Sequence, residues 1–159
     1  MDVWKAGPEI YEIMFDLIDK HHHHLLLVKD EIGIALKEKA SSPGGVKVYG
    51  KTSKAAPLFN AFQATEYKFL IVLAGDEWQH TLSQTQKMAL IDHHLCSMLV
   101  EEDADEGTVK CSVKPPDFIG YRAEVERWGF WRPECDPDAP TPVEQMFGVI
   151  EPDEPDEAE

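Results

Sequence analysis

One segment of the sequence decides the fold that we predict, Ala89-Leu90-Ile91-Asp92-His93-His94-Leu95-Cys96-Ser97-Met98. It follows Ser83-Gln84-Thr85-Gln86, a capping-box pattern in which a serine and a glutamine satisfy backbone N–H groups at the start of a helix. We therefore expect a helix from this box to about Val100. His93 and Ser97, four residues apart, lie together beside its apolar face. That face is predicted to consist of Met88, Ile91, Leu95, Met98 and Leu99.

The preceding segments predict an α+β domain with a small mixed sheet and packed helices. An apolar stripe of helical period favours a helix over residues 8–18. Ile32, Ile34 and Leu36 alternate with smaller or polar residues, which favours a strand. The turn residues 41–45 and the segment 46–50 would complete a hairpin with that strand. The continuous apolar run 67–74 predicts a central strand covered on both faces.

The C-terminal part of the chain changes character after Trp131. Before that point we expect a short strand at 109–113 and a last helix over 117–128, with inward-facing Phe118, Tyr121, Val125 and Trp128. Residues 132–159 hold six of the 11 prolines, and ten acidic residues against one basic residue. We therefore divide the chain into a domain at 1–131 and an acidic, partly disordered tail at 132–159. Residues 151–159 are expected to be disordered, and residues 143–150 to dock on the core.

Composition limits the partners and the compartment. With 30 acidic and 15 basic residues, the formal net charge is −15, which disfavours direct binding to nucleic acid and favours a protein partner with a basic surface. The longest apolar run, residues 69–74, is too short to cross a membrane. The first residues carry no signal-peptide pattern, and three cysteines fit a reducing compartment. We expect a cytoplasmic protein.

The segment around His93 also resembles a catalytic motif in altered form. In the helical pattern His-Glu-x-x-His, two imidazoles one turn apart bind zinc, and the glutamate activates a zinc-bound water. Here His93 occupies the first position, His94 replaces the glutamate and Ser97 replaces the second histidine.

Three local patterns carry a resemblance to a known family. The first is His24-Leu25 followed by Ile32-Gly33-Ile34-Ala35-Leu36. The second is Trp78, Leu82-Ser83 and Gln86, followed by the segment 89–96. The third is Lys114-Pro115-Pro116-Asp117-Phe118 followed by Val125-Glu126-Arg127-Trp128-Gly129-Phe130-Trp131. Over roughly residues 8–131 the chain resembles the phage metallopeptidases, relatives of the SprT-like zincins, and the resemblance implies a minimal zincin-like domain.

The resemblance also implies site residues. His93 falls on the first zinc-ligand position and His94 on the general-base position. Ser97 falls on the second ligand position, although a hydroxyl is a poor zinc ligand. Pro116 falls on the third ligand position and has no donor atom. We therefore expect a degenerate active site without ordinary peptidase activity.

A rearranged metal site is an alternative. His93 and Cys96 lie three residues apart on the predicted helix and could both reach one zinc ion, and Asp92 and Cys96 lie four apart. Further ligands would come from Cys111, Glu101 or the run His21–His24. A lone cysteine beside an apolar face is more often a core residue, and the histidine run is more often a solvated helix end.

Three functions remain open from the sequence. The first is a metallopeptidase-like phage protein with a degenerate site that acts by binding a protein, in the host cytoplasm if a phage encodes it. The second is a metalloenzyme with the rearranged site, for which zinc is the candidate cofactor. The third is an acidic phage counter-defence inhibitor that imitates nucleic acid with its carboxylates.

Overall fold

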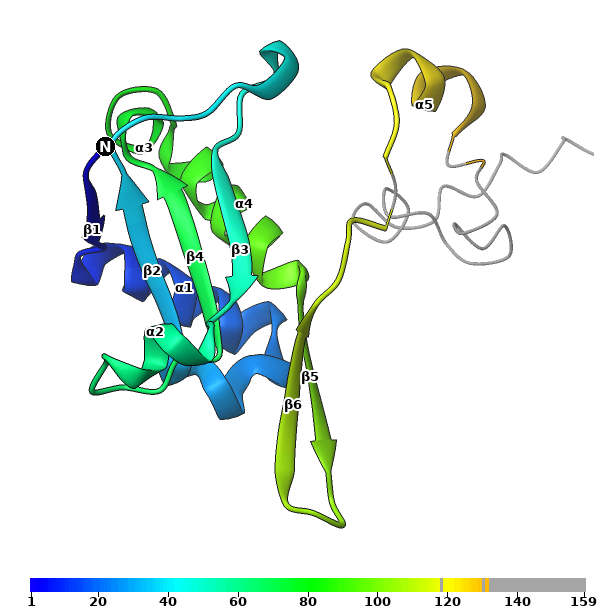
Figure 1. The fold of residues 1–159 in the computed structure, drawn as a ribbon. Coiled ribbons are helices and arrows are strands. Elements are labelled where there is room, and N and C mark those ends of the chain that lie inside the picture. Colours follow the sequence, from blue (N-terminus) through cyan, green and yellow to red (C-terminus); the bar gives the residue numbers. More distant parts are fainter. Residues whose placement is uncertain (118, 130, 132–159) are drawn as a thin grey trace, which may run out of the picture. The chain divides into compact units, whose positions relative to one another are not determined.

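A four-stranded sheet forms the centre of the first unit of the chain, Met1–Lys114 (Figure 1). The computed structural model describes residues 1–117, 119–129 and 131. The strand order is β1-β2-β4-β3, in which β2 and β4 are parallel and the other two pairs are antiparallel. The strands are β1 (Val3–Lys5), β2 (Ile32–Lys37), β3 (Gly50–Lys54) and β4 (Phe69–Ala74).

The mixed α+β class and the central place of β4 are confirmed, but the predicted hairpin is wrong. The segment 46–50 does not pair with β2 as a strand, and Val46 is exposed. Instead β3 begins at Gly50 and pairs with β4. The apolar strand β4 takes the position with neighbours on both sides, and the polar strand β3 takes an edge, where polar residues are best tolerated.

The cover of β4 also differs from the prediction. Phe69, Ile71 and Leu73 are fully buried on one face, whereas Leu70 and Val72 on the other face are only partly buried. These two residues line an open pocket of about 330 Å³. The strand is therefore covered completely on one face only.

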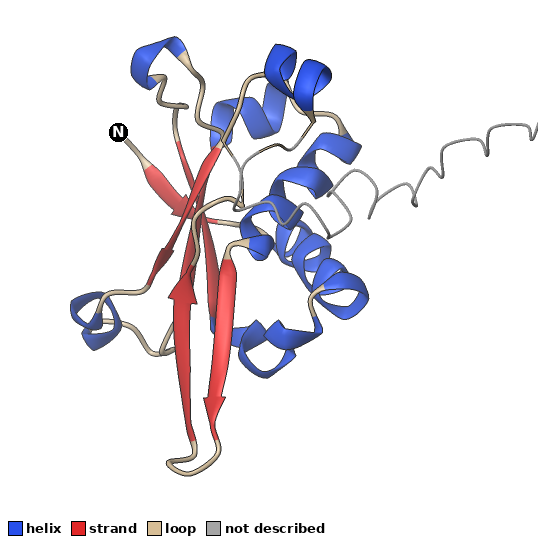
Figure 2. Ribbon diagram, turned by 90° about the vertical axis from the view of Figure 1, so that its right-hand side faces the viewer, coloured by secondary structure: helices blue, strands red, loops and turns tan. Residues whose placement is uncertain are grey.

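Two long helices cover that buried face. They are α1 (Pro8–His21) and α4 (Gln84–Cys96), which pack against each other (Figures 1 and 2). The predicted capping box is confirmed: Ser83 Oγ accepts from the N–H of Gln86, and Gln86 Oε1 accepts from the N–H of Ser83. Such a cap stabilises a helix by about 1 kcal/mol. The shorter helices are η1 (His23–Glu31), η2 (Pro43–Gly45), α2 (Pro57–Ala61) and α3 (Gly75–His80).

Helix α4 ends four residues earlier than predicted. Its last residue is Cys96, and β5 (Met98–Asp103) begins directly after Ser97. The carbonyl of Ser97 accepts from the N–H of Lys114, and Met98 is fully buried. Long-range contacts of the new strand thus override the helical period that continued to Leu99 in the sequence. The strand predicted at 109–113 is confirmed as β6 (Thr108–Val113), which pairs with β5 as a hairpin.

The second unit contains one described helix, α5 (Arg122–Trp128), which ends at Gly129 with a positive φ of 67°. The predicted helix start at 117 is therefore too early. The inward orientation predicted for two aromatic residues is also wrong, because Tyr121 is 82% exposed and Trp128 is 72% exposed. A helix of two turns has too little surface to bury several large side chains at once. Phe118 and the predicted tail at 132–159, with its docking segment 143–150, lie outside the described residues.

Within the part of the chain that the structure describes, every helix is too short or too polar to cross a lipid bilayer.

Candidate functional site

His94 is a buried residue that joins α4 to the sheet. Its side chain lies between α4 and β3, and its Nδ1 lies 2.8 Å from the hydroxyl oxygen of Thr52. Burial, and after it the neighbouring His93, lowers the pKa of His94 to about 4. The imidazole is therefore neutral at pH 7, with one nitrogen engaged by Thr52.

The ring of His94 is accommodated by a glycine. A Cβ atom at Gly50 would lie 2.5 Å from Nε2 of His94. This Nε2 is buried and has no hydrogen-bond partner among the described residues. A buried polar atom without a partner costs about 1–3 kcal/mol, so His94 is held at some cost in stability.

His93 and Ser97 do not join His94 in a common site. His93 is exposed, and its ring meets the His94 ring edge-on, with centroids 5.2 Å apart. The hydroxyl of Ser97 donates over 2.6 Å to the carbonyl of His94, which also accepts from the backbone N–H of Ser97. The side chains at the three motif positions, 93, 94 and 97, therefore lie in different surroundings and do not converge on one point.

A separate group of donor atoms lies where the end of α1 meets α4. His22, Asp92 and Cys96 each offer one atom, and these atoms all lie within 4.8 Å of one another. Nε2 of His22 lies 2.7 Å from Oδ1 of Asp92, and Sγ of Cys96 donates to Oδ2 of the same carboxylate over 3.9 Å. Among the residues that the structure describes, it is the one such group of three or more histidine, cysteine or acidic side chains.

The histidine run is thus not uniformly solvated, contrary to the preferred interpretation of the sequence. His22 is only 6% exposed, whereas His21, His23 and His24 are exposed. Nε2 of His23 contacts the carbonyl of Asp19, and Nε2 of His24 contacts the carbonyl of Met98. Only His22 reaches the donor group on α4.

Cys96, the second residue predicted as a metal ligand, belongs to this group, but His93 does not. The sequence did contain part of the signal, since Asp92 and Cys96 are one helical turn apart. The histidine that meets them is 70 residues away in the chain, and periodicity says nothing about such a contact.

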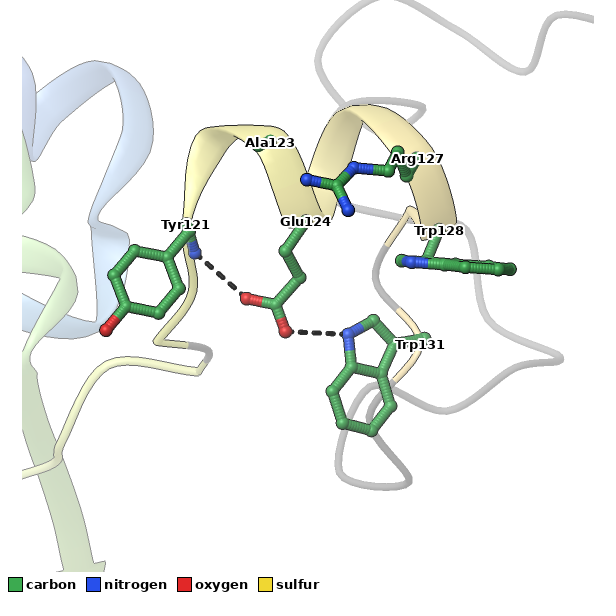
Figure 3. Close-up of a pocket in the computed structure, with 6 residues that line it drawn as sticks. All are labelled: Tyr121, Ala123, Glu124, Arg127, Trp128 and Trp131. Carbon is green, nitrogen blue, oxygen red and sulfur yellow. Dashed lines mark hydrogen bonds between the residues drawn. The ribbon is translucent and has the colours of Figure 1, made fainter.

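An aromatic pocket lies on α5 in the second unit (Figure 3). The carboxylate of Glu124 accepts from the N–H of Tyr121 over 2.9 Å and from the indole N–H of Trp131 over 2.8 Å. The second bond holds the indole of Trp131 at the pocket, which has a volume of about 790 Å³. Its lining residues are Tyr121, Ala123, Glu124, Arg127, Trp128 and Trp131.

Comparison with known proteins identifies the family. Neither the curated proteins nor the solved structures include a match to the chain. Among protein families, the one described as "Putative phage metallopeptidase" matches residues 2–148. The match extends beyond residue 131, into the segment predicted as a tail. Since it covers more than half of the sequence, the chain belongs to the phage metallopeptidase family.

Proposed function

We propose that this member of the phage metallopeptidase family has a degenerate hydrolytic centre and acts by binding a protein partner in the cytoplasm. The observation that carries the first part is the state of His94, at the general-base position of the motif. It is neutral at pH 7, buried and hydrogen-bonded to Thr52. A zinc hydrolase uses a carboxylate at this position to activate the bound water.

The ligand positions support the same proposal. A hydrolytic zinc ion takes three protein ligands and keeps one open position. Here the three positions hold His93, Ser97 and Pro116. His93 offers an imidazole, the hydroxyl of Ser97 is bonded to the carbonyl of His94, and Pro116 has no donor atom in its side chain. These residues do not fit the metal centre that the family name implies, and we derive no catalytic step from it.

Restoring the motif tests the loss of the centre. We expect the wild-type chain to show no cleavage of a fluorescent casein and no zinc that depends on His93. The double variant His94→Glu, Ser97→His should gain zinc binding, which His93→Ala in the same background removes. Elemental analysis of protein purified without a polyhistidine tag measures the zinc. Casein cleavage by the wild type that His93→Ala abolishes would contradict the proposal.

The aromatic pocket on α5 supports the second part. Trp128 and Trp131 are 72% and 57% exposed, and large exposed aromatic side chains are typical of protein-binding surfaces. The indole of Trp131 is held by Glu124, which lowers the entropy lost when a partner orders this side chain. The formal net charge of −15 favours a partner with a basic surface and disfavours bare nucleic acid.

Loss of the two tryptophans tests the surface. The variant Trp128→Ser, Trp131→Ser is expected to weaken partner binding by at least about 30-fold, since interface tryptophans commonly contribute 2 kcal/mol or more. Cross-linking in host extract followed by mass spectrometry identifies the partner and the linked residues, and titration of the purified pair gives the affinity. Trp4→Ser, on β1 in the first unit, is the matched control. An affinity that the double variant leaves unchanged would exclude this surface.

A further inference from the structure

Three chemically different donor groups meet at the junction of α1 and α4. They are the imidazole of His22, the carboxylate of Asp92 and the thiol of Cys96. Asp92 is in the middle: one of its oxygens faces the imidazole at 2.7 Å, and the other faces the sulfur at 3.9 Å. None of the three has a role in the motif of the family or in the proposed function.

The fold itself brings these residues together. Asp92 and Cys96 share one face of α4, because they are separated by one helical turn. His22 caps the C-terminus of α1, and its backbone N–H donates to the carbonyl of Ile18 over 3.1 Å. Since α1 packs against α4, this cap position places the imidazole beside Asp92.

The burial of the three groups is graded. The side chain of His22 is only 8% exposed, that of Asp92 is 40% exposed, and Cys96 lies at the surface. The most rigid donor is thus the innermost one, and the thiol remains accessible to an ion arriving from solvent. An ion can therefore reach the site from solvent at Cys96, and His22 is held in place by the surrounding residues.

The distances suit a small divalent ion. Zinc binds imidazole nitrogen at about 2.0–2.1 Å, carboxylate oxygen at about 2.0–2.2 Å and thiolate sulfur at about 2.3 Å. In tetrahedral geometry the donor atoms would then lie roughly 3.4–3.6 Å from one another. The shortest separation, 2.7 Å, and the limit of 4.8 Å for all three lie on either side of that value. Binding of an ion therefore requires rotation of the half-buried Asp92 side chain and the exposed Cys96 side chain.

A simple ion pair explains only part of this arrangement. It would account for His22 and Asp92, which hold α1 against α4, but it gives no role to the sulfur beside the second carboxylate oxygen. His23 and His24 have their own contacts, with the carbonyls of Asp19 and Met98. Nitrogen, oxygen and sulfur donors together are the set that zinc-like ions prefer.

We propose that His22, Asp92 and Cys96 bind one divalent transition-metal ion of the zinc type, separately from the degenerate motif. The ion links the end of α1 to α4. Binding releases the thiol proton of the exposed Cys96 to solvent, replaces the hydrogen bonds to Asp92 with coordination bonds, and leaves the fourth position to water. Because His93 is not a ligand, this site and the motif can be tested independently.

Cobalt is the probe for this site, because a thiolate bound to Co²⁺ gives a charge-transfer absorption band that carboxylate and imidazole ligands do not give. The full chain, purified without a polyhistidine tag and stripped with chelator, is titrated with Co²⁺ and then with competing Zn²⁺. We expect one equivalent of cobalt with the thiolate band, displacement by zinc, and a higher melting temperature with either ion.

Four variants assign the ligands. Cys96→Ser should abolish the thiolate band, and because Cys96 is exposed this variant is expected to fold. Loss of a residue that only hydrogen-bonds to a metal ligand weakens metal binding by roughly 10–100-fold. His22→Gln and Asp92→Asn, which remove ligands themselves, should each weaken cobalt binding by more than that. His93→Gln, on the same helix and exposed, is the matched control and should bind as the wild type does.

Two results would overturn the proposal. One is a wild-type chain without stoichiometric cobalt or without the thiolate band. The other is a band that His93→Gln abolishes and His22→Gln preserves, which would assign the ion to His93 and Cys96 instead.

Discussion

Acidification from pH 6.5 to pH 4 is expected to reduce the free energy of unfolding by roughly 3 kcal/mol through His94 alone. The pKa of this histidine is lowered from 6.5 to about 4 in the folded chain, mainly by burial. Above pH 6.5 both the folded and the unfolded states are neutral at this position, and His94 adds no pH dependence. Below pH 6.5 the unfolded state binds a proton that the folded state does not, so stability falls until about pH 4.

Urea unfolding measured across this range tests the expectation. Other groups titrate over the same range, so the informative quantity is the difference between variants. Between pH 6.5 and pH 4, the free energy of unfolding should fall more steeply with decreasing pH in the wild type than in His94→Gln. The difference in slope should correspond to about one bound proton, whatever the starting stability of the variant. His80→Gln, which replaces an exposed histidine, should follow the wild-type profile. Parallel profiles for the wild type and His94→Gln would show that His94 is protonated as readily in the folded chain as in the unfolded chain.

Replacement of Phe69 by alanine is expected to cost about 3–5 kcal/mol, the usual range for a buried aromatic residue. Phe69 is fully buried at the start of β4, where β2 lies on one side and β3 on the other. The cavity left by the ring cannot close easily, because paired strands hold the backbone in place. A domain of this size has only about 5–15 kcal/mol of stability in total, so much of the population could unfold.

The control for this variant is Phe62→Ala. Phe62 is 82% exposed, and its loss should change stability by no more than about 0.5 kcal/mol. The midpoint of urea unfolding gives both values, and an unchanged slope would show that the unfolded state is unaffected. Equal losses in the two variants would contradict the central position of β4 in the core.

Local patterns in the sequence predicted the elements whose cause is local. The capping box at Ser83 and Gln86 sets the start of α4, and the alternation from Ile32 to Leu36 sets β2; both were confirmed. Strand pairing is not local. The hairpin was assigned because two segments are neighbours in the chain, whereas the actual partner of β3 is β4, the more apolar strand that follows it.

The candidate sites show the same division. The spacing of Asp92 and Cys96 was visible in the sequence, but nothing local indicates that His22 meets them across two helices. The position of His94 in a motif is visible in the sequence, but its surroundings are not. Its burial, the main cause of its lowered pKa, depends on how α4 lies over β3.

The close approach between His94 and Gly50 links two positions that are 44 residues apart. Any larger residue at position 50 would meet the ring nitrogen, so the two sites are expected to covary: histidine at 94 requires glycine at 50. A shorter or more flexible side chain at position 94 would release that restriction. Lineages of this family that keep a carboxylate on the helix should therefore tolerate alanine or serine at the start of the edge strand, and lineages with an imidazole there should not.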